Sequence, residues 1–263
     1  MEVLVGVLVA LGMILMGNAI EGGHIGSIVG GPAAMIVIGG TIGAVIVQFP
    51  FSTLKGALAA AAGAMKKSKH EPAKMIEELV GYANRARKEG ILALEKTAQS
   101  ASDPFLAKAL MMAVDGTDSN TLRDTMELAI TQHEEHGEDG AKVFEAAGGY
   151  CPTIGIIGAV LGLIHVMSNL SDINAVGSGI AAAFVATIYG VAAANIVFLP
   201  MAGRIKLRVR EETTMMSMVL TGVLAIQEGM NPKLVRERLT QFLSPSHGKA
   251  GGGAGLEPAK AAG

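Results

Sequence analysis

The tetrapeptide His-Glu-Glu-His at residues 133–136 is the closest approach to a metal-binding motif in this sequence. Zinc proteases place two histidines four residues apart on one helix face, so that both imidazoles reach the same ion. Here the histidines are only three apart, and further acids follow at Glu138 and Asp139. We interpret the segment as a solvated acidic stretch and expect no bound metal.

The other chemistry-bearing residues form no catalytic arrangement. The sequence has no P-loop, and its Gly155–Gly158–Gly162 series lies inside an apolar run rather than in a dinucleotide-binding loop. His24 and His165 are isolated histidines near the ends of apolar runs, where a structural or interfacial role is expected. No nucleophile–base pair can be assembled from the spacing. The sequence therefore predicts a protein that is not an enzyme, has no cofactor and has no nucleic-acid partner.

Four apolar runs, at residues 3–20, 33–51, 152–167 and 180–199, are each near the length needed to cross a membrane. The third is short unless its helix begins upstream. The first lacks a basic leader, so we interpret it as a retained span rather than a signal peptide. None of the runs contains Asp, Glu, Lys or Arg. Ion pathways through a bilayer normally need such a group. If ions cross here, another chain must supply the carboxylate.

The positions of Lys and Arg predict the topology. All 21 of them lie within residues 55–142 or 204–260, and the connectors at 21–32 and 168–179 have none. The positive-inside rule places both basic segments and both termini in the cytoplasm. We expect an all-α membrane protein with four transmembrane helices and a helical cytoplasmic domain between the second and third. Its segments are a hairpin (1–54), that domain (55–149), a second hairpin (150–203), cytoplasmic helices (204–243) and a disordered tail (244–263).

Local signals predict helices within the insert. Glu71-Pro72 should begin a helix that stops before Gly90, and Asp103-Pro104 should begin another that ends at Asp115-Gly116. Apolar residues at helical spacing after Ser119 indicate a third helix, which we expect to run on into the third span.

Small residues form a stripe on each helix of the second hairpin. The members are Gly155, Gly158, Ala159 and Gly162 in the third span, and Ala183, Thr187, Gly190 and Ala194 in the fourth. Such stripes let another helix approach closely. We expect a partner helix to use them; the alternative is that they pack only on each other. Pro152 is interpreted as opening the third span and Pro200 as closing the fourth.

Several separated motifs resemble one family. ARKEGILALE at 86–95, DGTDS at 115–119, YCPTIGIIGAVLGL at 150–163 and FVATIYG at 184–190 occur in the order found in flagellar motor stator A subunits, the MotA/PomA family. The resemblance covers essentially residues 1–243. It implies five copies in the bacterial inner membrane around a MotB-like B subunit, which carries the membrane Asp and a peptidoglycan-binding domain.

The family's roles map onto residues of this chain. The resemblance implies that Arg87 and Glu95 face a FliG-like rotor protein; they are eight residues apart, about two turns if the helix continues across Gly90. It also implies that Pro152, Ala159, Thr187 and Tyr189 lie near the partner's Asp, with Pro152 and Pro200 as hinges. Sodium-driven members carry a threonine seven residues after the proline and a Thr-Thr pair in the fourth span. Here these positions read Ala159 and Ala186-Thr187, so we expect H⁺ to be the coupling ion.

Two alternatives remain. ExbB/TolQ-type energisers of outer-membrane processes belong to the same superfamily, but they have three spans and lack the leading hairpin. A membrane scaffold that conducts nothing is the other. An ordinary secondary transporter fits less well, because the two hairpins show no repeat and no broken charged helix.

Overall fold

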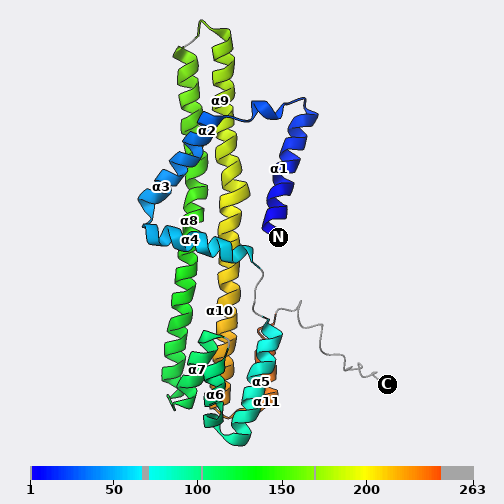
Figure 1. Cartoon of the computed structure of the whole chain (residues 1–263), viewed down its shortest axis with the longest axis vertical. Helices are drawn as coiled ribbons and strands as arrows, with labels where there is room; N and C mark the ends of the chain where they lie inside the picture. The colour runs from blue at the N-terminus through cyan, green and yellow to red at the C-terminus, as the bar shows by residue number, and fades with distance from the viewer. Residues whose placement is uncertain (1, 67–70, 102, 169, 244–263) are drawn as a thin grey trace, which may run out of the picture. The chain divides into compact units, whose positions relative to one another are not determined.

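The computed structural model describes residues 2–66, 71–101, 103–168 and 170–243, without the side chains of 173–175, and these ranges are helical throughout apart from short connections (Figure 1). The predicted disordered tail, 244–263, lies outside the described residues. The chain divides into two compact units. Unit 1 contains Met1–Lys67 and His133–Arg210, and unit 2 contains Ser68–Gln132 and Glu211–Gly263.

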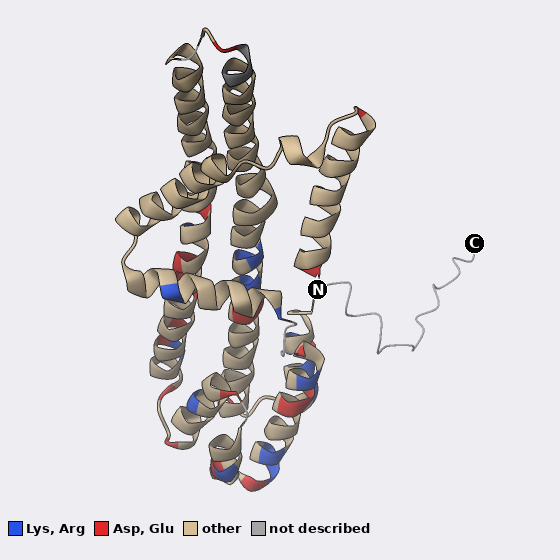
Figure 2. Ribbon diagram, turned by 45° about the horizontal axis from the view of Figure 1, so that its top comes forward, with Lys and Arg blue, Asp and Glu red and all other residues tan. Residues whose placement is uncertain are grey.

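Unit 1 holds the apolar helices. In the described part of the chain, four helical stretches are long and apolar enough to cross a membrane, which confirms the predicted fold class. Figure 2 shows how little charge they carry along their apolar lengths. The stretches are α1 (Glu2–Ile20); α2 (Gly31–Ala34) with a π-helical segment η2 (Met35–Gly39) and α3 (Gly40–Gln48); α8 (Ser119–Ser168); and α9 (Ile173–Ala192) with a second π-helical segment η4 (Ala193–Phe198) and α10 (Leu199–Gln227). A short 3₁₀ turn, η1 (Ile25–Ser27), follows α1.

Neither proline ends a helix. Helix α8 is continuous for 50 residues with Pro152 in its interior, so the third span begins upstream as expected and its length is no longer short. The interpretation of Pro152 as a helix start is wrong. Pro200 lies in the first turn of α10, which continues directly from η4. A proline ring clashes with the carbonyl four residues earlier in an α-helix, and the wider π-turn at Ala193–Phe198 relieves that clash at Pro200.

Helix α4 (Phe51–Met65) is an element that the sequence analysis missed. It begins after Pro50, and in Figure 1 it crosses the view of α8 and α10. Its buried face consists of alanines, and Ala61 and Ala64 pack in one cluster with Ile205 and Val209. The Arg204 Nε donates a hydrogen bond to the Ala64 carbonyl oxygen at 3.4 Å. Helix α4 is therefore held to the segment that follows the fourth span.

Unit 2 is built from short helices around the outer ends of α8 and α10. They are α5 (Pro72–Glu89), a 3₁₀ turn η3 (Ile91–Leu94), α6 (Glu95–Ser100), α7 (Pro104–Val114) and α11 (Pro232–Thr240). The predicted helix start at Asp103-Pro104 is confirmed, because the Asp103 side chain accepts from the Phe105 and Leu106 amides. Asn231 caps α11 in the same way. These caps satisfy amides that a helix leaves unpaired at its first turn.

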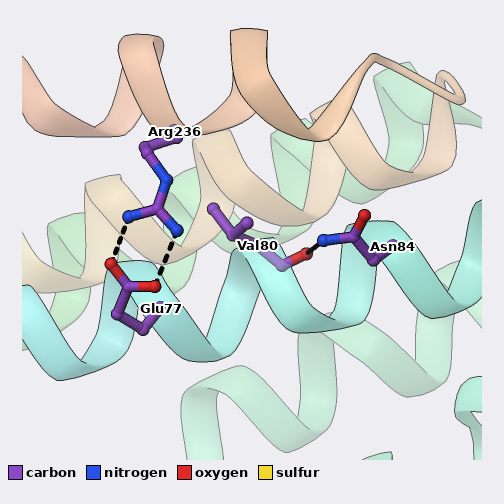
Figure 3. A network of polar contacts seen from close by, with 4 residues as sticks. All are labelled: Glu77, Val80, Asn84 and Arg236. Carbon is purple, nitrogen blue, oxygen red and sulfur yellow. Dashed lines mark hydrogen bonds and ion pairs between the residues drawn. The ribbon is translucent and has the colours of Figure 1, made fainter.

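Helices α5 and α11 are joined by apolar packing and by one bidentate ion pair. Val235 and Leu239 of α11 are fully buried, in the same cluster as Leu79 of α5. Beside them, the two terminal guanidinium nitrogens of Arg236, Nη1 and Nη2, donate to the Glu77 carboxylate, with Nη2 at 2.6 Å from Oε2 (Figure 3). Such fork-to-fork pairs fix geometry as well as charge.

The Glu77–Arg236 pair should make the stability of unit 2 depend on acid pH. Hydrogen bonds from Arg236, followed by its positive charge, hold the pKa of Glu77 below its ordinary value. A lowered folded-state pKa contributes stability above the unfolded-state pKa, and that stability is lost as pH falls through the folded value. Because the pair is exposed, we expect a small effect. Thermal unfolding of the purified protein between pH 6 and 3 should show a shallower loss in Glu77→Gln. Equal pH profiles in Glu77→Gln and the control Glu237→Gln would contradict this.

Candidate functional site

The small-residue stripes of α8 and α9 pack against each other within the chain. A Cβ added to Gly190 would lie 2.6 Å from the Cys151 carbonyl oxygen and 3.1 Å from the Pro152 Cα. A Cβ on Gly155 would lie 2.9 Å from the Ala186 carbonyl oxygen. These separations are shorter than side chains allow, so glycine is required for the two backbones to touch here. Within the single chain, the two small-residue stripes therefore pack on each other.

The contact between α8 and α9 continues toward the connection between these two helices. A Cβ on Gly162 would meet the Ala183 Cβ at 3.0 Å, and a Cβ on Gly158 would meet the Ala186 Cβ at 2.8 Å. Ala183 and Ala186 are buried. Four of the residues that were predicted to face a partner therefore lie in the contact between α8 and α9: Gly155, Gly162, Ala183 and Gly190.

Three residues of that set lie at the edge of this contact instead. Pro152, Ala159 and Thr187 are half-buried. The Thr187 Oγ1 donates to the Ala183 carbonyl oxygen at 3.3 Å, so its hydroxyl is engaged by its own helix. Apolar side chains next to them point outward, including Ile156 and Phe184, of which Phe184 is 67% exposed. The surface that remains for another helix is therefore largely apolar, and the threonine hydroxyls beside it, of Thr187 and the exposed Thr153, each donate to a carbonyl of their own helix. Pro200 is exposed and lies apart from this group.

Tyr189 has a specific role that sequence reasoning missed. Its hydroxyl donates to the Ile28 carbonyl oxygen at 2.8 Å and accepts from the Gly30 amide at 3.1 Å. The connector of the first hairpin is thereby tied to α9. A tyrosine in an apolar span normally needs a hydrogen-bond partner for its hydroxyl. The presence of Tyr189 in the fourth span was therefore the only sequence signal for this contact.

The predicted rotor-facing residues do not share one helix. Arg87 is in the last turn of α5, and Glu95 is the first residue of α6. Between them Gly90 has φ +84° and ψ 161°, a conformation that side-chain-bearing residues rarely adopt. The helix therefore does not continue across Gly90 and stops before it, as the sequence predicted, and both side chains are exposed. Arg87 and Glu95 flank a tight bend instead.

Arg85 and Leu92 complete this bend, and the sequence analysis missed both. The Arg85 Nη1 donates to the Thr97 hydroxyl at 3.3 Å, and its Nε pairs with Glu89 at 3.3 Å. The hydrogen bond to Thr97 connects α5 to α6 across Gly90, and the pair with Glu89 lies within α5. Leu92, in the 3₁₀ turn between Arg87 and Glu95, is 70% exposed. The bend thus presents an apolar side chain flanked by opposite charges.

The His-Glu-Glu-His segment lies within α8, and both His133 and His136 have interaction partners. Among the residues that the structure describes, no group of three or more His, Cys, Asp or Glu side chains is placed to hold a metal ion.

Comparisons with known proteins agree over almost the whole chain. Residues 4–90 match the family described as motility protein A N-terminal, and residues 97–218 match the MotA/TolQ/ExbB proton channel family. Motility protein A of Bacillus subtilis is 34% identical over 244 residues, covering 91% of this chain and 89% of that protein. Chemotaxis protein PomA of Vibrio alginolyticus is 35% identical over 223 residues, covering 85% of this chain and 87% of that protein.

Two solved structures are similar to the whole fold. The Campylobacter jejuni MotAB structure matches with a TM-score of 0.89 and 29% identity, covering 93% of this chain and 96% of that chain. The flagellar MotAB stator complex from Bacillus subtilis matches with a TM-score of 0.87 and 32% identity, covering 92% of this chain and 96% of that chain.

Proposed function

The chain belongs to the MotA/PomA stator A subunits of the MotA/TolQ/ExbB proton channel family, and we propose from this premise that it couples inward H⁺ flow to torque on a flagellar rotor. It is a multi-pass membrane protein and a channel subunit rather than an enzyme. The observation that carries the proposal is the absence of Asp, Glu, Lys and Arg from the packed α8–α9 pair and its continuation through η4 into α10, at residues 146–168 and 173–203. A proton path along this pair needs a carboxylate from a second chain.

That second chain is proposed to be a MotB-like B subunit with an Asp in its single span. Solved relatives described as MotAB support such a complex. We further propose a ring of five A chains in the inner membrane, embedded in lipid, with both termini in the cytoplasm. Residues 1–54 and 150–203 then form the membrane hairpins, 55–149 and 204–243 the cytoplasmic part, and 244–263 a tail.

The half-buried edge of the α8–α9 contact is the proposed pore-facing surface. Pro152, Ala159 and Thr187 lie there, and they would meet the partner's Asp. Pro152 lacks an amide hydrogen inside a continuous helix, so it leaves a backbone carbonyl free where α8 could bend when the Asp changes charge. The exposed Pro200 would serve similarly at the cytoplasmic end.

Co-expression with the B subunit tests the function. Deletion of this gene should abolish swimming, and the chain should co-purify with the single-span partner and restore swimming only in its presence. Normal swimming in the deletion strain would contradict the proposal. A scaffold would co-purify without ion flux. The ExbB/TolQ alternative is disfavoured because the match to the motility protein A N-terminal family covers residues 4–90, which include the leading hairpin.

Charge reversal at the bend should impair rotor engagement. Arg87→Glu and Glu95→Lys place like charges against the complementary charges that we propose on the rotor protein. An exposed pair contributes only about 0–1 kcal/mol, so the contact would steer engagement rather than hold it, and reversal adds repulsion. We expect swimming speed to fall several-fold, with recovery when the facing rotor charge is also reversed. The control is Lys74→Glu, in the first turn of α5, the helix that carries Arg87. Wild-type speed in both single reversals would contradict a rotor contact.

A further inference from the structure

The first carboxylate beyond the apolar length of α8 meets a lysine at the start of the charged part of α10. On α8 no Asp, Glu, Lys or Arg lies between Glu145 and the helix end at Ser168, and the segment from Ile173 to Gly203 also has none. Figure 2 shows the described parts of these lengths in tan. Glu145 is therefore the carboxylate of α8 closest to the proposed pore, and Arg204 and Lys206 are the nearest cations on α10.

Glu145 and Lys206 form an ion pair between the two helices. The Lys206 Nζ lies 2.7 Å from the Glu145 Oε1, and the two side chains are 48% and 42% exposed, respectively. The neighbouring charges have other partners. Arg204 pairs with Glu2 of α1 at 2.9 Å.

The register of α8 places Glu145 on the proposed pore face. Glu145, Pro152 and Ala159 follow one another at steps of seven residues. Seven residues make almost two helical turns, so the three lie along one side of α8, with Glu145 about 10 Å from Pro152 along the axis. A proton that leaves a carboxyl near Pro152 toward the cytoplasm thus meets Glu145 as the first carboxylate on that side.

We propose that Glu145 is the proton acceptor at the cytoplasmic end of the pathway and that Lys206 holds its carboxylate in position. The inference rests on the proposed function. The partner's Asp carboxyl would release its proton to water, and the Glu145 carboxylate would take it up. Lys206 remains an ammonium throughout and loses its counter-charge while Glu145 is neutral. Glu145 then passes the proton to cytoplasmic water, which restores the ion pair and readies the path for the next proton.

Single amide substitutions separate this role from a purely structural ion pair. Glu145→Gln and Lys206→Gln break the same pair, but only the first removes the acceptor. The variants replace the chromosomal gene, and bead assays measure rotation at low load, where ion transit limits speed, and at stall. We expect Glu145→Gln to slow low-load rotation by roughly tenfold, since positioned acid–base groups contribute at least this much. Lys206→Gln keeps the acceptor but frees it from its positioning partner, so it should slow low-load rotation by about two- to threefold, clearly less than Glu145→Gln. Glu145→Asp, which keeps a carboxylate at 145, should stay within about twofold of the wild type. Stall torque and the amount of protein in the membrane should change little in each case.

The matched control is Asp139→Asn, which removes a carboxylate paired with Lys142 at 3.0 Å on the same helix, six residues farther from the pore. It should rotate at the wild-type rate. Wild-type low-load speed in Glu145→Gln, or equal slowing in Glu145→Gln and Lys206→Gln, would overturn the acceptor role and leave the stator function intact. If deletion of the gene leaves swimming unchanged, both the stator function and this inference fail.

Discussion

Replacing Gly190 with leucine should eliminate both the assembled protein and swimming. Any Cβ at this position meets backbone rather than a movable side chain, namely the Cys151 carbonyl oxygen at 2.6 Å and the Pro152 Cα at 3.1 Å. The helices α8 and α9 must then separate. Overpacking a core costs about 1–3 kcal/mol when side chains can shift, and we expect a larger cost here because backbone atoms cannot. Gly190→Ala should show a milder defect of the same kind.

The measurements are the amount of protein in the membrane, its thermal unfolding in detergent and swimming speed. Gly43→Leu in α3 is the matched control, because a Cβ there would meet nothing within 4 Å. It should leave the amount of protein in the membrane and the unfolding temperature unchanged. If Gly190→Leu accumulated and unfolded like the wild type, the close approach of α8 and α9 at this glycine would be contradicted.

The parts of the fold that hydropathy and local capping determine could be predicted from the sequence. The four spans follow from apolar length, and Asp103 was identified as a cap because an acid before proline satisfies first-turn amides. Helix α4 was missed because its buried face consists of alanines, at 57, 61 and 64, which give a weak hydropathy signal. The place of Pro152 in its helix was predicted wrongly. An internal proline destabilises a helix in water, but a membrane helix that packs against another tolerates one.

The candidate site was predicted less completely, because spacing does not say what a face contacts. Gly155 and Gly190 were identified as close-packing positions, but whether they served a partner or each other depended on the tertiary arrangement. The connection of Tyr189 to Ile28 and Gly30 joins segments about 160 residues apart, which no local pattern encodes. Gly90 was expected to stop a helix, yet only its backbone conformation shows that Arg87 and Glu95 flank a bend.

Swimming should continue at full speed without sodium and should stop when a protonophore is added. A hard cation such as Na⁺ needs several oxygen ligands in place of its water shell, whereas a proton needs one carboxylate and a chain of water or hydroxyl groups. At the three positions where the family resemblance implies threonine in sodium-driven members, this chain has Ala159, Ala186 and Thr187. The Ala186 methyl is buried against α8, and the Thr187 hydroxyl already donates to the Ala183 carbonyl oxygen at 3.3 Å. At these three positions the proposed pore-facing edge therefore offers one side-chain oxygen, that of Thr187, which is fewer than the several that sodium needs.

The test is swimming speed in potassium buffer with and without sodium, and then with the protonophore. Speed should vary less than about twofold with sodium and fall to near zero when the proton gradient collapses, since each step of the proposed mechanism needs one proton on the Asp that we propose in the B subunit. A sodium-driven stator expressed in the same host is the control, and it should respond in the opposite way. Backbone carbonyls near Pro152 are the remaining source of oxygen ligands, because a proline leaves a carbonyl unpaired in the preceding turn. Speed that tracked external sodium and survived the protonophore would show that these carbonyls coordinate the ion and that Ala159 does not exclude it.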